Sequence, residues 1–261
     1  MYVFARRPKW IVSHLLVLLA VVTMIGMGLW QLDRLGQRKD RNAEVTARTA
    51  EPVVEVASLV SVTDDNDVGE VVRWREVTAT GEYRAEDEVL ILARPMNAAE
   101  GYWALTPLVL ADGTAVAVNR GWVPFDPGPG EARPDSAPPA GPVTVTGLAR
   151  ETVEPSGLQS ADPSEGVLEA LARPDLARFE QQLDYPLLPV YIQLQTQSPA
   201  GLGLPVALGE PELDEGPHLS YAFQWLVFTI IAVVGYPLVL RRVARSEGKD
   251  RRHSDIPVDY L

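Results

Sequence analysis

Residues 216–228, GPHLSYAFQWLVF, mark the point where an acidic segment gives way to a long apolar run. On a helix, the spacing of His218, Tyr221, Ala222 and Trp225 is i, i+3, i+4, i+7, so the four residues share one face. The 22 residues from 219 to 240 contain no Asp, Glu, Lys or Arg, which is about the length that crosses a bilayer core of roughly 30 Å. The stretch therefore predicts a transmembrane helix over residues 218–240.

A second apolar run, WIVSHLLVLLAVVTMIGMGLWQL, covers residues 10–32 and is equally free of charged residues. Arg6, Arg7 and Lys9 precede it, as they would in a secretory signal peptide. The run is longer than a usual signal core, and the residues after it, DRLGQRKDR, contain no A-x-A-like cleavage site. We therefore expect an uncleaved transmembrane anchor over residues 10–32.

The distribution of positive charge predicts the topology. The segment 241–253, RRVARSEGKDRRH, carries six Lys or Arg, whereas the twenty residues before His218 carry none. The positive-inside rule therefore places the tail, residues 241–261, in the cytoplasm, and two crossings place residues 1–9 there too. Residues 33–217 are then extracytoplasmic. Because no Arg- and Ser-rich presequence precedes residue 10, we expect a bacterial cell membrane.

The middle of the chain reads as a β-rich domain. Alternation of apolar and polar residues, with β-branched and aromatic enrichment, predicts strands over residues 52–60, 72–83, 88–94, 102–110, 114–123, 143–150 and 189–196. A short helix is expected over 172–183, with Asp175 as its N-cap, and residues 33–50 are expected to extend the first helix into water. The predicted fold class is two transmembrane helices plus a mainly-β α+β domain, either an antiparallel sheet or a partly closed barrel.

Composition excludes several classes of function. A net charge of −12 argues against a nucleic-acid partner, because phosphate binding needs clustered Lys and Arg. The absence of cysteine excludes disulfides, thiolate metal sites and a Cys nucleophile. The sequence contains three histidines and no G-x-S-x-G, H-E-x-x-H or Walker-type motif. We therefore predict that the protein is not an enzyme and needs no catalytic residue.

Two interpretations of His218, Tyr221 and Trp225 remain open on these residues alone. The first is an aromatic belt, because Tyr and Trp settle at the headgroup level of a bilayer. The second is a haem contact, because neutral imidazole is a common iron ligand and aromatic rings can flank a macrocycle. His14 lies near the cytoplasmic end of its run and is expected to be a histidine whose hydrogen bonds are satisfied.

Several motifs, in order along the chain, resemble the Surfeit locus family of cytochrome c oxidase assembly factors. They are GLWQLDR (28–34), RWREVTATGEY (73–83), GYWALTPLVLADGTAVAVNRGWVP (101–124), PVYIQL (189–194) and HLSYAFQW (218–225). The two-helix arrangement is similar as well. One departure is Gly216-Pro217, where the family often has asparagine before the histidine.

The resemblance implies a non-enzymatic chaperone of the respiratory chain that assists delivery of haem a to subunit I of the oxidase. Its expected partners are that subunit, haem a synthase and the lipid bilayer. The haem-contact residues that it implies are His218, as a ligand of the haem iron, with Trp225, Tyr221 and Arg34. The family motif residues are Trp30, Gln31, Arg34, Arg120, Gly121 and Trp122.

Structural roles compete for the last three of these motif residues. Arg120 could pair with a carboxylate, Gly121 could permit a bulge, and Trp122 could fill the core. Two other functions also remain open for the whole chain. One is a haem-independent chaperone that clamps an oxidase subunit, and the other is a membrane-tethered sensor or cell-wall enzyme, for which we find no catalytic cluster in residues 33–217.

Overall fold

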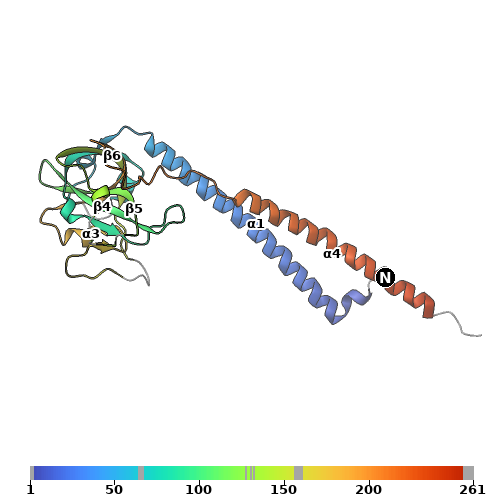
Figure 1. Ribbon diagram of the computed structural model, residues 1–261. Coiled ribbons are helices and arrows are strands. Elements are labelled where there is room, and N and C mark those ends of the chain that lie inside the picture. The colour runs from blue at the N-terminus through green and yellow to red at the C-terminus, as the bar shows by residue number, and fades with distance from the viewer. Residues whose placement is uncertain are drawn as a thin grey trace, which may run out of the picture. The chain divides into compact units, whose positions relative to one another are not determined.

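The computed structural model describes residues 3–63, 68–126, 128, 129, 131, 133–155 and 161–254 (Figure 1). The chain forms two compact units. One consists of Met1–Ala43 with Leu213–Leu261, and the other is Glu44–Glu212. This division reflects contacts within the chain and not the position of a membrane. The membrane boundaries predicted at residues 32 and 218 therefore stay predictions.

The first unit is a pair of long helices. A 3-10 turn, η1 (Val3–Arg6), precedes α1 (Pro8–Thr49), and α4 (His218–Ser254) follows the second unit in sequence. The predicted span 10–32 and its polar extension therefore form one continuous helix, as expected. Each helix contains a window long and apolar enough to cross a membrane, and none of either window is buried within the chain. Apolar surface left uncovered by the protein suggests membrane anchoring.

The two helices run antiparallel and lie side by side (Figure 1). Gln31 in α1 contacts His218 at the start of α4, and His14 contacts Tyr236 further along α4. The contact nearer the C-terminus of α4 thus involves a residue nearer the N-terminus of α1, as antiparallel packing requires. This arrangement brings family-motif residues from the two ends of the chain together.

The second unit is built around a closed sheet. Its strands are β1 (Val54–Glu55), β2 (Glu76–Tyr83), β3 (Val89–Ile91), β4 (Gly101–Leu110), β5 (Ala115–Pro124), β6 (Pro142–Glu151), β7 (Ala170–Leu171) and β8 (Leu187–Ser198). Five of them follow one another in the order β2-β6-β8-β5-β4, and pairing of β2 with β4 closes the ring. The pairing therefore supports the barrel alternative over an open sheet.

The sheet is mixed, which corrects the expectation of purely antiparallel pairing. β5 and β8 pair in parallel, as do β1 with β2 and β3 with β7. Parallel neighbours need a long crossover connection rather than a hairpin, and the chain between β5 and β8 contains β6, β7 and α3. Strand alternation shows which faces are apolar but carries no information on strand direction.

Two short helical turns replace parts of the predicted strands. They are η2 (Val56–Ser58) and α2 (Gly69–Val72), whereas η3 (Ala85–Asp87) and η4 (Pro134–Ser136) lie between predicted strands. The strand expected over 52–60 is only the two residues of β1, because the chain turns into η2. The strand expected over 72–83 begins at Glu76, because α2 ends at Val72 and Trp74 has a positive φ of 60°.

The predicted helix over 172–183 is shorter than expected, but its start is confirmed. It is α3 (Leu176–Glu180), and the Asp175 carboxylate accepts a hydrogen bond from the Arg178 backbone nitrogen at 3.0 Å. An aspartate N-cap satisfies one of the free donors of the first helical turn.

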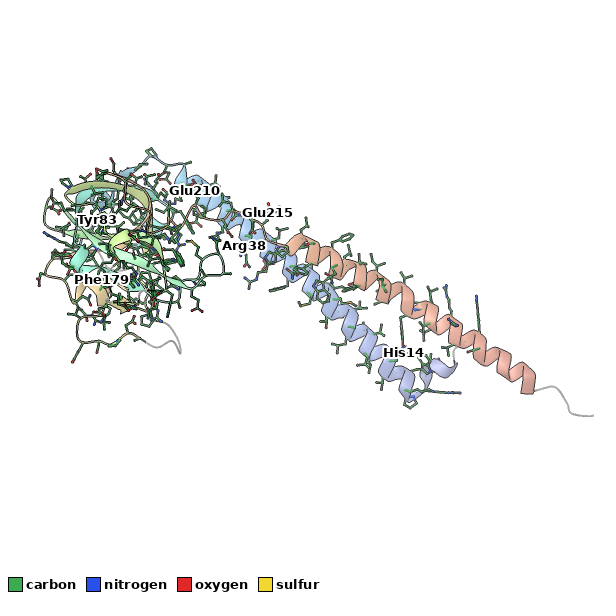
Figure 2. All side chains as sticks on the ribbon, in the orientation of Figure 1. His14, Arg38, Tyr83, Phe179, Glu210 and Glu215 are labelled. Carbon is green, nitrogen blue, oxygen red and sulfur yellow. The ribbon has the colours of Figure 1, made fainter. Side chains whose placement is uncertain are left out.

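Two apolar clusters lie on opposite sides of the barrel wall. The first fills the interior and receives residues from all five barrel strands, for example Val77 and Val145. The second lies outside and includes Phe179 of α3 (Figure 2). Neighbouring residues of β8 separate in this way, with Ile192 in the first cluster and Tyr191 in the second, because successive strand side chains point to opposite faces.

Candidate functional site

His218 is held at the first position of α4 by the residues before it. The Pro217 carbonyl accepts a hydrogen bond from the Tyr221 backbone nitrogen at 3.1 Å, which closes the first turn. Gly216 has a φ of +67°, a conformation that glycine adopts without the strain that a side chain brings. Gly216 and Pro217 therefore set the backbone direction at the start of α4. In the family, asparagine often precedes the histidine at this place.

The imidazole of His218 bonds to an amide across the helix pair. Its Nδ1 lies 2.8 Å from the side-chain oxygen Oε1 of Gln31, a buried residue of α1. An amide oxygen only accepts hydrogen bonds, so Nδ1 carries the proton. In a neutral imidazole the other nitrogen, Nε2, then has a free lone pair.

The Nε2 edge of this ring is open. Within the part of the chain that the structure describes, no hydrogen bond is made to Nε2 of His218. A Cβ atom at Gly216 would lie 3.3 Å from Cδ2 and 3.4 Å from Nε2 of this ring. The absence of a side chain at Gly216 therefore leaves room at the nitrogen that bears the lone pair.

The helical face predicted from the spacing of residues is the face that meets α1. Ala222 is buried, His218 and Trp225 are half-buried, and Tyr221 is exposed at the edge. A Cβ at Gly28 would lie 3.6 Å from Cβ of Trp225, so this glycine lets the two helices approach closely. The prediction that these four residues share a face is confirmed.

The motif at residues 28–34 divides between two faces of α1. Gln31 turns toward α4, whereas Trp30 is 46% exposed, because adjacent helical residues are about 100° apart. The Arg34 guanidinium lies 5.6 Å from the centre of the Trp30 ring and donates to Gln37 at 2.8 Å. The structure describes no contact of Arg34 with His218, so its contact with a cofactor stays a prediction.

His14 makes two hydrogen bonds, as expected for a satisfied histidine. Its Nδ1 lies 2.7 Å from the Tyr236 hydroxyl, and its Nε2 lies 3.2 Å from the Ala5 carbonyl oxygen. The same hydroxyl lies 3.0 Å from Oγ of Ser13. With both ring nitrogens occupied, His14 has no free lone pair to offer a metal.

Arg120, in the barrel motif, lies in a closed polar cluster. It is 3% exposed, and it donates to Oε2 of Glu88 at 2.7 Å, to Oγ1 of Thr106 at 2.9 Å and to the Ser136 carbonyl. The Thr106 hydroxyl in turn donates to the same Glu88 oxygen at 2.6 Å. The alternative in which Arg120 pairs with a carboxylate is confirmed.

Gly121 and Trp122 complete this block with largely structural roles. Gly121 has a φ of +127°, and a Cβ there would come within 2.2 Å of the Val206 carbonyl oxygen. The register of β4 and β5 shifts opposite Arg120, so the expected bulge is present. Trp122 is only half-buried, with its indole nitrogen donating to the Arg94 carbonyl at 2.8 Å, so it fills the core less than expected.

Tyr83, which is labelled in Figure 2, lies beside the Arg120 cluster. Its ring centre is 5.7 Å from the Arg120 guanidinium, and its hydroxyl donates to Gln197 at 3.0 Å. Burial raises the pKa of Tyr83 well above its ordinary value, and the positive charge of Arg120 opposes that rise. The phenol is therefore neutral at physiological pH and acts as a packing and hydrogen-bonding group.

These features define a class of protein: two apolar helices suited to membrane anchoring, a closed β-barrel between them in sequence, and an imidazole–amide pair where the second helix begins. Within this class, the SURF1 family model matches residues 18–230. The chain therefore belongs to the SURF1 family. Membership implies a cytochrome oxidase assembly factor.

Relatives match along nearly the whole chain. An uncharacterised SURF1-like protein of Mycobacterium tuberculosis is 29% identical over 257 residues, covering 97% of this chain and 92% of the relative. A SURF1-like protein of Rickettsia felis is 23% identical over 88% of this chain and 98% of its own length. One of Caenorhabditis elegans is 25% identical over 88% of this chain and 74% of its own.

The sequence motifs identified Gln31 and His218 as candidate site residues, but they did not predict the hydrogen bond between the two side chains. A weak signal existed, because both residues lie in motifs next to the outer ends of the predicted spans. A pocket formed by Arg150, Trp74 and Tyr191 was missed altogether. These residues are far apart in sequence and carry no spacing pattern.

Proposed function

We propose that the protein assists delivery of haem a to subunit I of cytochrome c oxidase, with His218 as a transient ligand of the haem iron. The observation that carries the proposal is the state of the His218 ring. Gln31 holds the proton on Nδ1, and the space beside Gly216 leaves Nε2 open. A carbonyl group that fixes the tautomer of a metal-binding histidine in this way also raises its basicity.

The donor set suits a porphyrin better than a bare metal ion. Among the described residues, no group of three His, Cys, Asp or Glu could hold a metal. A porphyrin brings four nitrogen ligands of its own, so a single imidazole, that of His218, would be enough to hold its iron. One protein ligand also favours release, which a carrier requires.

Neighbouring residues have proposed supporting roles. Trp225, half-buried on the same face of α4, offers an aromatic surface to a macrocycle, and Tyr221 lies exposed at the edge of that face. Arg34 lies one helical turn after Gln31 with an exposed guanidinium, a group that pairs bidentately with carboxylates such as haem propionates. Trp30 stacks against Arg34 and would limit its movement.

The proposed location is a bacterial cell membrane, with both termini cytoplasmic and residues 33–217 outside. The support is the cluster of six Lys or Arg after residue 240 and their absence in the twenty residues before His218. In this topology the start of α4 lies at the outer face. Subunit I and haem a synthase are the proposed partners there.

The test is haem content after purification from cells that make haem a. We expect wild type to show a Soret band and His218→Ala to lose most of it. His14→Ala is the matched control, because this histidine also lies in an apolar run but has both nitrogens engaged. Equal haem in wild type and His218→Ala would remove His218 from the role.

A second candidate is a chaperone that clamps an oxidase subunit without binding haem. The observation that favours it is that the His218–Gln31 bond joins α1 to α4, as the Tyr236–His14 bond does. In that case both contacts only hold the helix pair together. No Soret band in wild-type protein, combined with loss of oxidase on deletion of the protein, would support this candidate.

A further inference from the structure

A pocket with charged and aromatic side chains in its lining opens on the barrel wall, where β2 begins and where β6 and β8 lie side by side. It has a volume of about 260 Å³, and its lining includes Arg73, Trp74, Arg150, Glu151 and Tyr191. Arg150 and Tyr191 are register partners on adjacent strands. Tyr191 belongs to the apolar cluster outside the barrel, so the pocket lies on the outer surface of the barrel.

Arg150 is held in a fixed position inside this pocket. Its guanidinium lies 4.5 Å from the centre of the Trp74 ring, a favourable cation–π distance. Trp74 itself has a φ of +60°, a conformation that costs a bulky residue free energy and that collects at ligand sites. The backbone therefore bears strain to present this tryptophan to Arg150.

The charges that line the pocket do not balance. Arg73 pairs with Glu151, with 3.3 Å between Nε and Oε1. Across the described part of the chain, no carboxylate lies within ion-pair distance of Arg150. One positive charge is thus left over in a domain, residues 33–217, that contains 31 Asp or Glu against 14 Lys or Arg.

Arg94 is a second arginine near Tyr191, and no described carboxylate forms an ion pair with it. Arg94 is half-buried, and its Nε is buried with no hydrogen-bond partner among the described residues. Burial lowers the pKa of Arg94. Burial raises the pKa of Tyr191, and the charges of Arg150 and Arg94 oppose that rise. A partly buried guanidinium without a counter-ion is costly, so an external anion would stabilise this region.

We propose that this pocket binds a carboxylate group, with Arg150 as the bidentate donor, Trp74 as its support and the Tyr191 hydroxyl as an additional donor. The single excess positive charge matches a monoanion, and the planar guanidinium matches the two oxygens of a carboxylate. The carboxylate comes either from a small free acid or from an acidic side chain of another protein. This inference does not depend on haem binding at His218.

The test measures ligand binding to the full chain in detergent at constant ionic strength. The probes are acetate and a blocked Gly-Glu-Gly peptide, with a Gly-Gln-Gly peptide and inorganic phosphate as comparisons. We expect a carboxylate probe to raise the thermal unfolding midpoint, as a ligand specific to the folded state does. Arg150→Gln should weaken that binding at least tenfold, and Arg150→Lys should weaken it less.

The outcomes distinguish a free acid from a protein side chain as the source of the carboxylate, and a carboxylate from a phosphate as the ligand. Binding of the glutamate peptide alone assigns the site to a protein side chain, and binding of acetate at least as tightly assigns it to a free acid. Arg84→Gln, which changes an exposed arginine outside the pocket, should bind as wild type does. The proposal is overturned if no carboxylate probe binds, if phosphate binds as well as the carboxylates, or if Arg150→Gln binds as tightly as wild type.

Discussion

Arg120 in the barrel and His218 in the helix pair are both motif residues with polar side chains, but their surroundings differ. Arg120 is almost fully buried, and three groups from other parts of the barrel accept its hydrogen bonds. His218 is half-buried and uses one of its two ring nitrogens. The polar groups of the barrel cluster thus bond to one another, whereas Nε2 of His218 has no hydrogen-bond partner in the part of the chain that the structure describes.

The difference separates structural motif residues from candidate binding residues. A buried polar group that is fully paired within the protein rigidifies the fold. A ring nitrogen that has no partner among the described residues, in an imidazole whose tautomer is set by a neighbour, is a candidate for binding a group outside the chain. Of these two motif regions, the helix pair is therefore where ligand binding is expected.

The largest expected effect is in the barrel, from the substitution Glu88→Ala. This change leaves the charge of Arg120 buried without its partner, which costs on the order of 3–5 kcal/mol. The thermal midpoint of the barrel, followed by circular dichroism, should fall by roughly 10 °C. Glu86→Ala, which removes an exposed carboxylate from the 3-10 turn that ends just before Glu88, is the control. Equal effects would mean that the cluster is not a structural unit.

A smaller but more specific effect is expected from Gln31→Leu in the helix pair. Without the amide oxygen, the proton of the His218 ring is no longer held on Nδ1. Loss of such a supporting contact typically lowers metal affinity by about 10- to 100-fold. Haem titration of the purified protein would measure it. Glu44→Leu removes an exposed polar side chain from another part of α1, more than three helical turns away, and should leave the affinity unchanged. If both variants bind haem as wild type does, Gln31 has no supporting role.

The smallest effect is expected from Tyr236→Phe at the other end of the helix pair. It removes the hydroxyl that contacts His14 and Ser13, and such bonds between membrane helices contribute about 0.6 kcal/mol on average. The thermal midpoint should fall slightly, with haem content unchanged. A clear loss of haem would show that the two ends of the helix pair are coupled. It would contradict the view that His14 only holds the helices together while His218 binds the ligand.

Elements with a strong local signal were predicted from sequence with nearly correct limits. The predicted strand 102–110 is β4, Gly101–Leu110, and 143–150 is β6, Pro142–Glu151. β6 alternates apolar and polar residues, and β4 is a long run of aromatic and aliphatic residues, so each has a strong local preference for a strand. The segment 52–60 also alternates, but it pairs with β2 over only two residues. Whether a segment joins a sheet depends on the edge available to it.

The candidate site was predicted only in part, for a related reason. The face shared by His218, Ala222 and Trp225 follows from helical geometry and was correct. The expected contact of Arg34 with a cofactor stays a prediction. The pairing between the two helices could not be predicted, because the rotation of α1 about its own axis is set by packing. The structure places Gln31, rather than Arg34, opposite His218.

The sequence by itself determined the two membrane-length helices, most of the strands and the family, because length, charge, alternation and motifs are properties of neighbouring residues. Only the tertiary structure decided that the sheet closes through β2 and β4, that Glu88 neutralises Arg120, and which nitrogen of His218 is free. Each of these depends on residues far apart in the chain, 187 positions in the case of Gln31 and His218. Contacts over such separations are fixed by packing of the whole chain. Local sequence patterns show only which face of each helix or strand is apolar.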